Sequence, residues 1–443
     1  MPRGPQPGRE SLLRGVGIAL ARNPASQSLA EWWELANRDR GDENSPPLGG
    51  AGTLRFLAID TASACNLTCP RMCYYHSDIP TRPAAPIERF ESAIASAAAD
   101  LDLRVLTFSG KEPLIDAKRT CALARYANSI PDRRFAIGLV TNATLVERNW
   151  LHLDDLVAAG ALDFIDVSLD AGDAATHDRI RGSAGAFTAA QRALHRMLGA
   201  WPAVRIGVTS VLRRDNESSI LQLIADSDGR LTNFFVFPFQ PPVFGNEAPF
   251  EWAVIRHMIE ALAGQLAERR GRPIEVTLSL LGLHIADAVR DGLLDLSAVR
   301  EDVNGQIFYE WRIGEHCLTL LLQVLPETGR HVLRIMRDGA VLPNTHYLQS
   351  ADPWKFSIGS IQDEPLPAIY RRATGAAGAL SRLWRSRSTH SCRNRPCWPV
   401  CFGGIAVADH NLVKGEPLDR QPKLCLKTSN DFDQEPAFCE ATA

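Results

Sequence analysis

The sequence predicts an α/β fold built on a parallel sheet. Short apolar runs alternate with helical stretches along its first half, and polar motifs follow directly after several of these runs. The strand-like runs are residues 54–59, 105–108, 135–140, 164–169, 204–211 and 233–237. Such alternation is typical of repeated βα units. Because parallel α/β barrels carry their ligand sites at the carboxyl ends of the strands, we expect the functional residues at these ends.

The composition is that of an ordinary globular protein. Its 443 residues suffice for two or three domains. Hydrophobic residues make up 45% and charged residues 22%, as in soluble proteins generally. The net charge of −3 does not favour nucleic acid or anionic membranes as partners, and no apolar run reaches the roughly 18 residues of a membrane span. The cysteines are clustered, which favours metal sites in a reducing cytoplasm over disulfides.

Three cysteines follow the first strand within a short loop. They are Cys65, Cys69 and Cys73, and their thiolates can bind three irons of a [4Fe–4S] cluster. The fourth iron would then have no protein ligand, which leaves a position for chemistry, as the open position of a catalytic zinc site does. The alternative is a structural zinc site with His76, close in sequence, as the fourth ligand. The loop alone leaves this alternative open.

Further polar motifs follow the next three strands. A helix expected over 86–99 leads to the second strand, which ends in Ser109-Gly110-Lys111-Glu112 and a proline. Alone, this segment is compatible with an ordinary strand-to-helix turn. The third strand ends in Thr141-Asn142-Ala143-Thr144. The fourth runs into Ser168-Leu169-Asp170 and is followed by His177-Asp178-Arg179-Ile180-Arg181-Gly182, whose arginines alone would be assigned to a solvated helix face.

Together these motifs resemble the radical S-adenosylmethionine (SAM) superfamily. The cysteine loop is similar to the family's cluster loop, whose open iron chelates SAM. The usual Cys-x3-Cys-x2-Cys spacing would place Met72 at the third ligand position. A thioether is a weak neutral donor, whereas a thiolate is the normal iron–sulfur ligand, so we assign Cys73 as the ligand and expect a local bulge.

The resemblance also implies how SAM is bound. Residues 109–112 correspond to the family's Gly-Gly-Glu-Pro, where backbone and Glu hold the SAM amino group, with Lys111 in place of the second Gly. Ser168 and Asp170 would approach the ribose or the methionine moiety. Arg181, with Arg179 as the alternative, would pair with the SAM carboxylate, which a guanidinium matches bidentately. The residues implied to contact SAM are Ser109, Gly110, Lys111, Glu112, Asn142, Ser168, Asp170 and Arg181.

The resemblance covers roughly residues 53–245 and implies a partial (β/α)6 TIM-like barrel that is open on one side. Residues 1–52 are rich in Gly, Pro and charge at both ends, so we expect a partly disordered N-terminal extension. After the barrel we expect a helical linker over 246–315. Residues 316–443 are expected to form a small cysteine-rich α+β domain.

The C-terminal segment resembles the SPASM/twitch extension, which holds auxiliary [4Fe–4S] clusters beside the barrel. Asp338-Gly339 predicts a hairpin turn between two strands, and clustered cysteines follow. The implied ligands are Cys392, Cys397, Cys401 and Cys425. Asn344 stands where the family often has a cysteine, and Cys317 lacks partners, so we expect one auxiliary cluster. A structural zinc site is the alternative.

The resemblance implies an enzyme that cleaves SAM reductively to a 5′-deoxyadenosyl radical, which abstracts hydrogen from a substrate. Its electron would come from a partner such as flavodoxin or ferredoxin. SPASM members commonly modify ribosomally made peptides, so we favour peptide crosslinking or oxidation. The alternative is oxidation, epimerisation or decarboxylation of a sugar, nucleoside or aminocyclitol in natural-product biosynthesis. A hypothesis of another class is a non-enzymatic, zinc-stabilised binding module.

Overall fold

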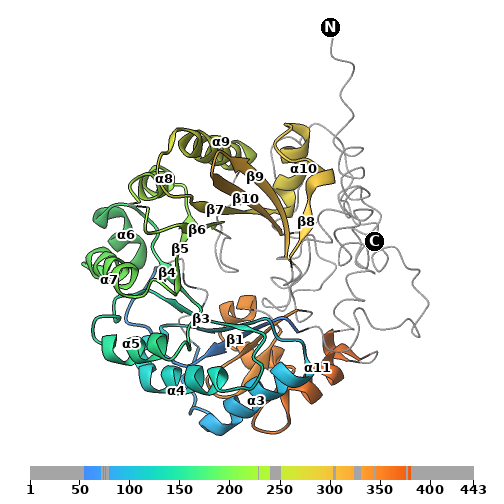
Figure 1. Cartoon of the computed structure of the whole chain (residues 1–443). Helices are drawn as coiled ribbons and strands as arrows, with labels where there is room; N and C mark the ends of the chain where they lie inside the picture. Colours follow the sequence, from blue (N-terminus) through green and yellow to red (C-terminus); the bar gives the residue numbers. More distant parts are fainter. Residues whose placement is uncertain are drawn as a thin grey trace, which may run out of the picture.

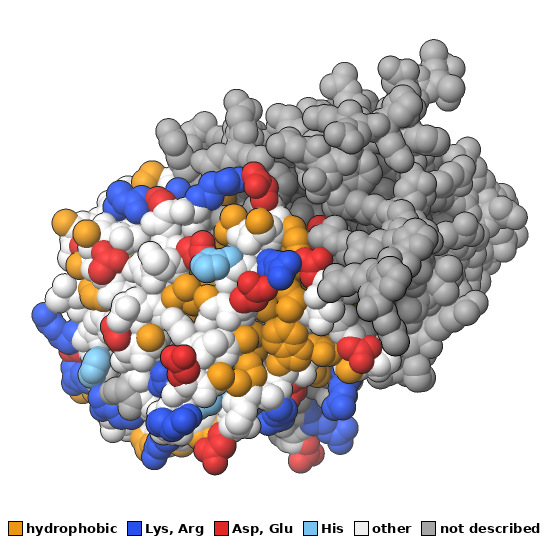
Figure 2. All heavy atoms as spheres, turned by 90° about the horizontal axis from the view of Figure 1, so that it is seen from above, with side chains coloured by type: hydrophobic (Ala, Val, Ile, Leu, Met, Phe, Trp, Pro, Cys, Tyr) orange, Lys and Arg blue, Asp and Glu red, His pale blue; other side chains and the backbone are white. Residues whose placement is uncertain are grey.

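The computed structural model describes residues 54–70, 73, 75, 79–227, 229–239, 251–302, 306–323, 331–343, 345–375 and 378–380. The strands of these residues form one sheet. Figure 1 shows the sheet curved into an open ring with helices around its outside. Figure 2 shows acidic and basic side chains interspersed over one face, in agreement with the small net charge. The predicted α/β fold class is confirmed.

The first half of the described chain is a run of βα units. Its strands are β1 (Phe56–Asp60), β2 (Val105–Ser109), β3 (Ala136–Thr141), β4 (Phe164–Ser168), β5 (Arg205–Leu212) and β6 (Asn233–Pro238). The connecting elements are α3 (Ile87–Asp100), η1 (Pro113–Asp116), α4 (Ala117–Asn128), α5 (Trp150–Ala158), α6 (Ala174–Arg181), α7 (Ala186–Ala200) and α8 (Glu217–Ala225). Each strand pairs in parallel with the next. The six predicted strands and the predicted helix over 86–99 are confirmed.

The sheet continues beyond these six strands. The next elements are α9 (Trp252–Glu268), β7 (Glu275–Leu281), α10 (Gly282–Arg290), η2 (Leu296–Ala298), β8 (Arg300–Glu301), β9 (Ile307–Ile313) and β10 (His316–Gln323). β7 is parallel to β6, β10 is parallel to β7, and β9 forms a hairpin with β10. The segment 246–315, expected to be a helical linker, therefore also contributes strands. Its β7 has the period-2 pattern of a barrel strand, with Val276, Leu278 and Leu280 all buried in the core.

The last described segment returns to the start of the sheet. Its elements are β11 (Val332–Ile335), β12 (Ala340–Leu342), η3 (Thr345–Gln349), η4 (Pro353–Phe356), β13 (Gly359–Ser360) and α11 (Leu366–Thr374). The predicted hairpin at Asp338-Gly339 is confirmed, because β11 and β12 are antiparallel. β11 also pairs in parallel with β1. The strands of residues 316–342 thus belong to the barrel sheet, and the expected boundary at residue 316 is not a break in that sheet.

The strands present different chemistry on their two faces. In β1, Leu57 and Ile59 pack into the apolar core that includes the helices, while Asp60 lies on the opposite face. The same alternation places Arg334 of β11 on that opposite face, where it contacts Asp60. The inner side of the ring is therefore polar at the carboxyl ends of the strands. None of the described helices is long and apolar enough to cross a membrane.

Candidate functional site

The cysteine loop begins where β1 ends, at the carboxyl edge of the sheet. Cys69 is buried, Cys65 is half-buried and Cys73 is exposed. Cys69 has a φ of 38°, a left-handed conformation that is uncommon for a residue with a side chain. The N–H of Cys73 donates to the carbonyl of Cys69 at 3.3 Å. This hydrogen bond joins the backbones of two of the predicted cluster ligands.

Gly182, at the end of α6, allows the loop to lie against that helix. Gly182 has a φ of 65°, and a Cβ there would stand 2.2 Å from Thr68 Oγ1 and 2.8 Å from Pro70 Cδ. The Thr68 hydroxyl donates to the Gly182 carbonyl at 3.2 Å, and the N–H of Cys69 donates to the Arg181 carbonyl at 3.0 Å. Glycine is required here both for its backbone conformation and for the space it leaves.

The surroundings of the thiols fit an anionic iron–sulfur group. Cys65 Sγ accepts from the Leu67 N–H at 3.4 Å and from the Asn142 amide at 3.7 Å. Burial raises the pKa of the Cys69 thiol to about 11, and the Arg181 charge acts against that rise. Hydrogen bonds and a nearby cation stabilise thiolates. Among the described residues, no three His, Cys, Asp or Glu side chains converge closely enough to hold a single metal ion.

Glu112 is fully buried where β2 ends. Its Oε1 accepts from the N–H of Leu114 at 3.0 Å and from the hydroxyl of Thr141 at 2.8 Å. Its Oε2 accepts from the N–H of Asn142 at 2.9 Å. Burial raises the pKa of the carboxyl, and these hydrogen bonds act against the rise. The residue expected to hold the SAM amino group thus ties the end of β2 to the end of β3.

Asp170 and Arg181 form a buried ion pair beside Cys69. Arg181 Nε lies 2.6 Å from Asp170 Oδ2, and the other carboxylate oxygen accepts from the N–H of Val211 at 2.9 Å. Asp170 is fully buried and Arg181 is 9% exposed. The two residues implied to contact different parts of SAM also contact each other, and this pair holds α6 against the sheet.

The other predicted contacts lie around the same edge. Asn142 donates to Asn66 at 3.0 Å, so the third strand end contacts the cysteine loop directly. Ser168 is half-buried at the end of β4. Gly110 has a φ of 112°, and a Cβ there would lie 2.8 Å from Asp60 Oδ1. Lys111 is half-buried beside it.

The C-terminal cysteine system is not described. Cys392, Cys397, Cys401 and Cys425 lie outside the described residues, as does Asn344. Cys317 is described and lies on β10, where its sulfur is 3.5 Å from the Thr319 hydroxyl. The auxiliary ligand set therefore stays a prediction.

Sequence reasoning missed a buried network at the end of β1. Asp60 forms an ion pair with Arg334 and accepts from the Tyr75 hydroxyl at 2.6 Å. Arg334 also donates to Ser109 Oγ at 3.3 Å. Burial raises the pKa of the Asp60 carboxyl, and Arg334 lowers it in return. A carboxylate at the end of an apolar strand was the signal in the sequence, but nothing nearby identified its partner.

His177 is a buried histidine of the predicted motif. Its Nδ1 accepts from the N–H of Asp170 at 3.1 Å, and its ring packs against Phe187. Burial lowers the pKa of the imidazole to about 4, although the Asp170 charge acts in the opposite direction. The folded protein therefore holds this residue neutral at ordinary pH.

We expect the protein to lose stability as the pH falls from about 6.5, the ordinary pKa of histidine, towards 4. Across this window the unfolded chain binds the proton that folded His177 excludes, so unfolding becomes easier by at most about 1.4 kcal/mol per pH unit. Urea unfolding across the window measures the slope. His177→Asn, whose amide oxygen can still accept, should flatten it, whereas His195→Asn, at an exposed position, should not. Equal slopes in all three proteins would contradict the prediction.

Comparison with known proteins matches this site to one family. The profile of the Radical SAM superfamily matches residues 59–226. AdoMet-dependent heme synthase of Nitratidesulfovibrio vulgaris is 25% identical over 167 residues, which are 38% of this chain and 43% of that protein. Fe-coproporphyrin III synthase of Methanosarcina barkeri is 30% identical over 35% of this chain and 36% of that protein. The chain thus spans less than half the length of the curated relatives it matches.

Solved structures share the fold. SuiB of Streptococcus suis, bound to S-adenosylmethionine, has a TM-score of 0.60 and 14% identity, with 83% of this chain and 76% of that chain covered. anSMEcpe with AdoMet and a peptide bound has a TM-score of 0.57 and 16% identity, with 84% of this chain and 94% of that chain covered. At these identities the likeness shows the fold alone.

Proposed function

This chain belongs to the radical SAM superfamily through residues 59–226, and from this premise we propose that it modifies a ribosomally made peptide by crosslinking or oxidation. The family uses SAM and a [4Fe–4S] cluster, so the protein is an enzyme, and the hypothesis of a non-enzymatic binding module is set aside. We assign Cys65, Cys69 and Cys73 as the cluster ligands. The observation that supports this assignment is their loop at the carboxyl end of β1, with Asn142 beside Cys65 and Arg181 beside Cys69.

When bound, the cluster and SAM supply a reductive cleavage that yields a 5′-deoxyadenosyl radical able to abstract hydrogen. The protein's own residues prepare the place for this chemistry. The Leu67 N–H and the Asn142 amide direct hydrogen-bond donors at Cys65. Glu112 and the Asp170–Arg181 pair fix the strand ends and α6 around the loop. Such fixed dipoles and charges need little rearrangement when the cofactors bind.

The peptide proposal is supported by the fold. A structure with the same fold was solved with AdoMet and a peptide bound. The second candidate is a small-molecule substrate, which the curated relatives favour, since their names refer to heme, coproporphyrin and a GTP cyclase.

We further propose one auxiliary cluster on Cys392, Cys397, Cys401 and Cys425. Clustered cysteines also support a reducing cytoplasm. The reductive chemistry of the family requires an electron donor, for which we propose flavodoxin or ferredoxin.

The reconstituted, reduced protein is expected to form 5′-deoxyadenosine from SAM and to make a precursor peptide lighter by two hydrogens. Anaerobic incubation with SAM, a reductant and a peptide encoded beside the gene tests both results by mass spectrometry. A deuterated peptide should transfer its label to 5′-deoxyadenosine. SAM cleavage with every peptide unchanged, and with label transfer from a sugar or nucleoside, would replace the peptide by the small-molecule candidate. No SAM cleavage at all would contradict the enzyme assignment itself.

A further inference from the structure

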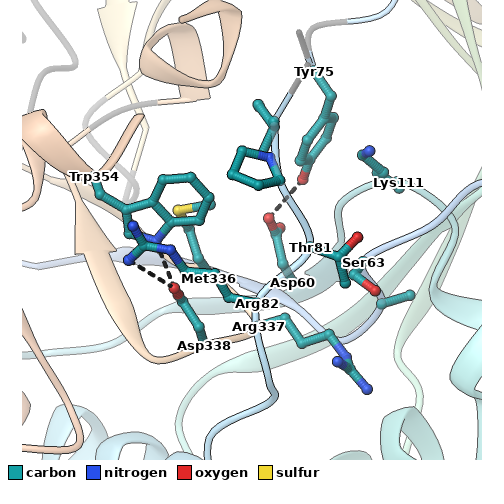
Figure 3. A pocket seen from close by; sticks show the side chains of 13 residues that line it. Asp60, Ser63, Tyr75, Thr81, Arg82, Lys111, Met336, Arg337, Asp338 and Trp354 are labelled. Carbon is teal, nitrogen blue, oxygen red and sulfur yellow. Dashed lines mark hydrogen bonds and ion pairs between the residues drawn. The ribbon is translucent and has the colours of Figure 1, made fainter. Parts of the chain in front are cut away.

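A pocket lies between the end of β1, the loop after β2 and the turn that joins β11 to β12 (Figure 3). The pocket opens to solvent, and about 410 Å³ of empty space, part of it open solvent, lies in and above it. Its lining comes from the ends of β1, β2 and β11 and does not include the Asp170–Arg181 pair, which lies beyond the end of β4. Of the residues implied to contact SAM, Lys111 lines this pocket and the other seven do not.

Most charges around the pocket are neutralised within the protein. Asp60 is paired with Arg334. Asp338 accepts from the indole N–H of Trp354 at 2.5 Å and lies 3.7 Å from Arg82. The Arg337 guanidinium points away from the other labelled side chains in Figure 3, and lies 3.6 Å from Asp116. The charges of these three acid–base pairs therefore cancel.

Lys111 is the charge that remains. No carboxylate of the described residues pairs with it, and its Nζ lies 5.7 Å from the centroid of the Tyr75 ring. Figure 3 shows the ammonium on the same side of the pocket as Tyr75. Gly110, with its positive φ and its close approach to Asp60, sets the turn from which Lys111 projects. A half-buried ammonium without a counter-charge is a ready partner for an anion.

Apolar and aromatic side chains also line the pocket. Tyr75, Ile79 and Trp354 pack on the small cluster formed by Met336, Leu342 and their neighbours. The Arg82 guanidinium stacks on the Trp354 ring at 3.5 Å, which fixes that ring as a flat wall. A ligand that fills this pocket therefore presents an apolar or planar body together with one negative charge. One ammonium balances a carboxylate, whereas a phosphate dianion would remain half unbalanced.

We propose that this pocket binds a carboxylate of the substrate, with the Lys111 ammonium as its counter-charge. The proposal rests on the proposed function, since it names the substrate class of that enzyme. The carboxylate belongs either to a free organic acid or to an acidic side chain of a peptide. Both sources require the same charge at Lys111.

Calorimetry on the full-length, cluster-loaded protein tests the charge requirement without turnover. The first probe pair is indole-3-acetate and its neutral isostere indole-3-acetamide. The second pair is the capped dipeptides acetyl-Leu-Glu-amide and acetyl-Leu-Gln-amide. We expect the wild-type protein to bind the charged member of at least one pair about tenfold more tightly. A preference in the first pair alone identifies a free acid, and a preference in the second identifies a peptide side chain.

Matched variants assign that preference to Lys111. Lys111→Met should abolish it and Lys111→Arg should retain it. Lys118→Met, which removes an exposed lysine outside the pocket, should leave it unchanged. Absence of a charge preference in the wild type, or a preference that persists in Lys111→Met, would overturn the proposal. The proposal would also be overturned if Lys111→Met bound SAM more weakly, Lys111→Arg restored that affinity, and the wild-type protein bound both members of each probe pair equally. None of these measurements requires SAM cleavage. The binding proposal can therefore prove wrong while the proposed activity is correct, and the reverse.

Discussion

Cys73→Ala is expected to abolish SAM cleavage and to lower the bound iron from about eight atoms to about four, since each [4Fe–4S] cluster holds four. Met72→Ala is expected to leave both nearly unchanged, because a thioether adds little to iron binding. The proteins are reconstituted anaerobically with iron and sulfide, and iron content, the cluster absorption band and 5′-deoxyadenosine are then measured. The remaining iron in Cys73→Ala reports the auxiliary site on Cys392, Cys397, Cys401 and Cys425.

Cys73 rather than Met72 stays the proposed ligand, because a thiolate is the normal iron–sulfur ligand and a thioether is a weak neutral donor. The N–H of Cys73 donates to the carbonyl of Cys69 at 3.3 Å, so a backbone hydrogen bond joins two of the proposed ligands. The opposite result, with loss of SAM cleavage in Met72→Ala and retention in Cys73→Ala, would show that Cys73 is not a cluster ligand. About four irons in the wild type would remove the auxiliary cluster, and about twelve would require ligands not assigned here.

Arg334→Leu is expected to destabilise the fold by about 3–5 kcal/mol, because it leaves the Asp60 carboxylate buried without its counter-charge. Asp60 is 3% and Arg334 is 7% exposed, so solvent cannot replace the lost partner. The free energy of unfolding is measured in urea on the protein without cofactors. Because the Tyr75 hydroxyl also donates to Asp60, the same variant should bind iron more weakly through its effect on the cysteine loop.

Two controls make this prediction specific. The double variant Asp60→Leu, Arg334→Leu removes both charges and should recover much of the loss. Arg256→Leu removes a half-exposed arginine that pairs with Glu260 and with Asp291. Pairs that solvent reaches contribute less than about 1 kcal/mol each. A loss in Arg334→Leu no larger than that in Arg256→Leu would show that the buried pair does not stabilise the fold.

The sequence was sufficient to predict the elements whose pattern lies within a short stretch of the chain. The six strands β1 to β6 alternate with helices, and the cysteine loop and the 168–182 motif are contiguous in the chain. It also identified which strand ends carry polar residues. The role of Glu112 was inferred from resemblance, and the structure shows a carboxylate engaged with the backbone of β3 and of its own turn.

What the sequence did not reveal depends on distant pairing. Asp60 and Arg334 are 274 positions apart, and they meet because β11 lies beside β1. No local pattern encodes which strand occupies that edge. β7 was overlooked because its apolar positions were assigned to a linker, although Val276, Leu278 and Leu280 alternate as in the other strands. The charge balance that isolates Lys111 likewise follows from pairs made across the fold.

The pairing of β1 with β11 has a consequence for synthesis on the ribosome. β1 leaves the ribosome early, but one of its two edges stays unpaired until residues 332–335 have been made. At 5–20 residues per second, the 274 positions between Asp60 and Arg334 take roughly 14–55 s to translate. During that time an apolar strand presents free N–H and C=O groups, the condition under which strands of different chains associate. We therefore expect chaperones present during translation, and slower expression, to increase the yield of folded protein.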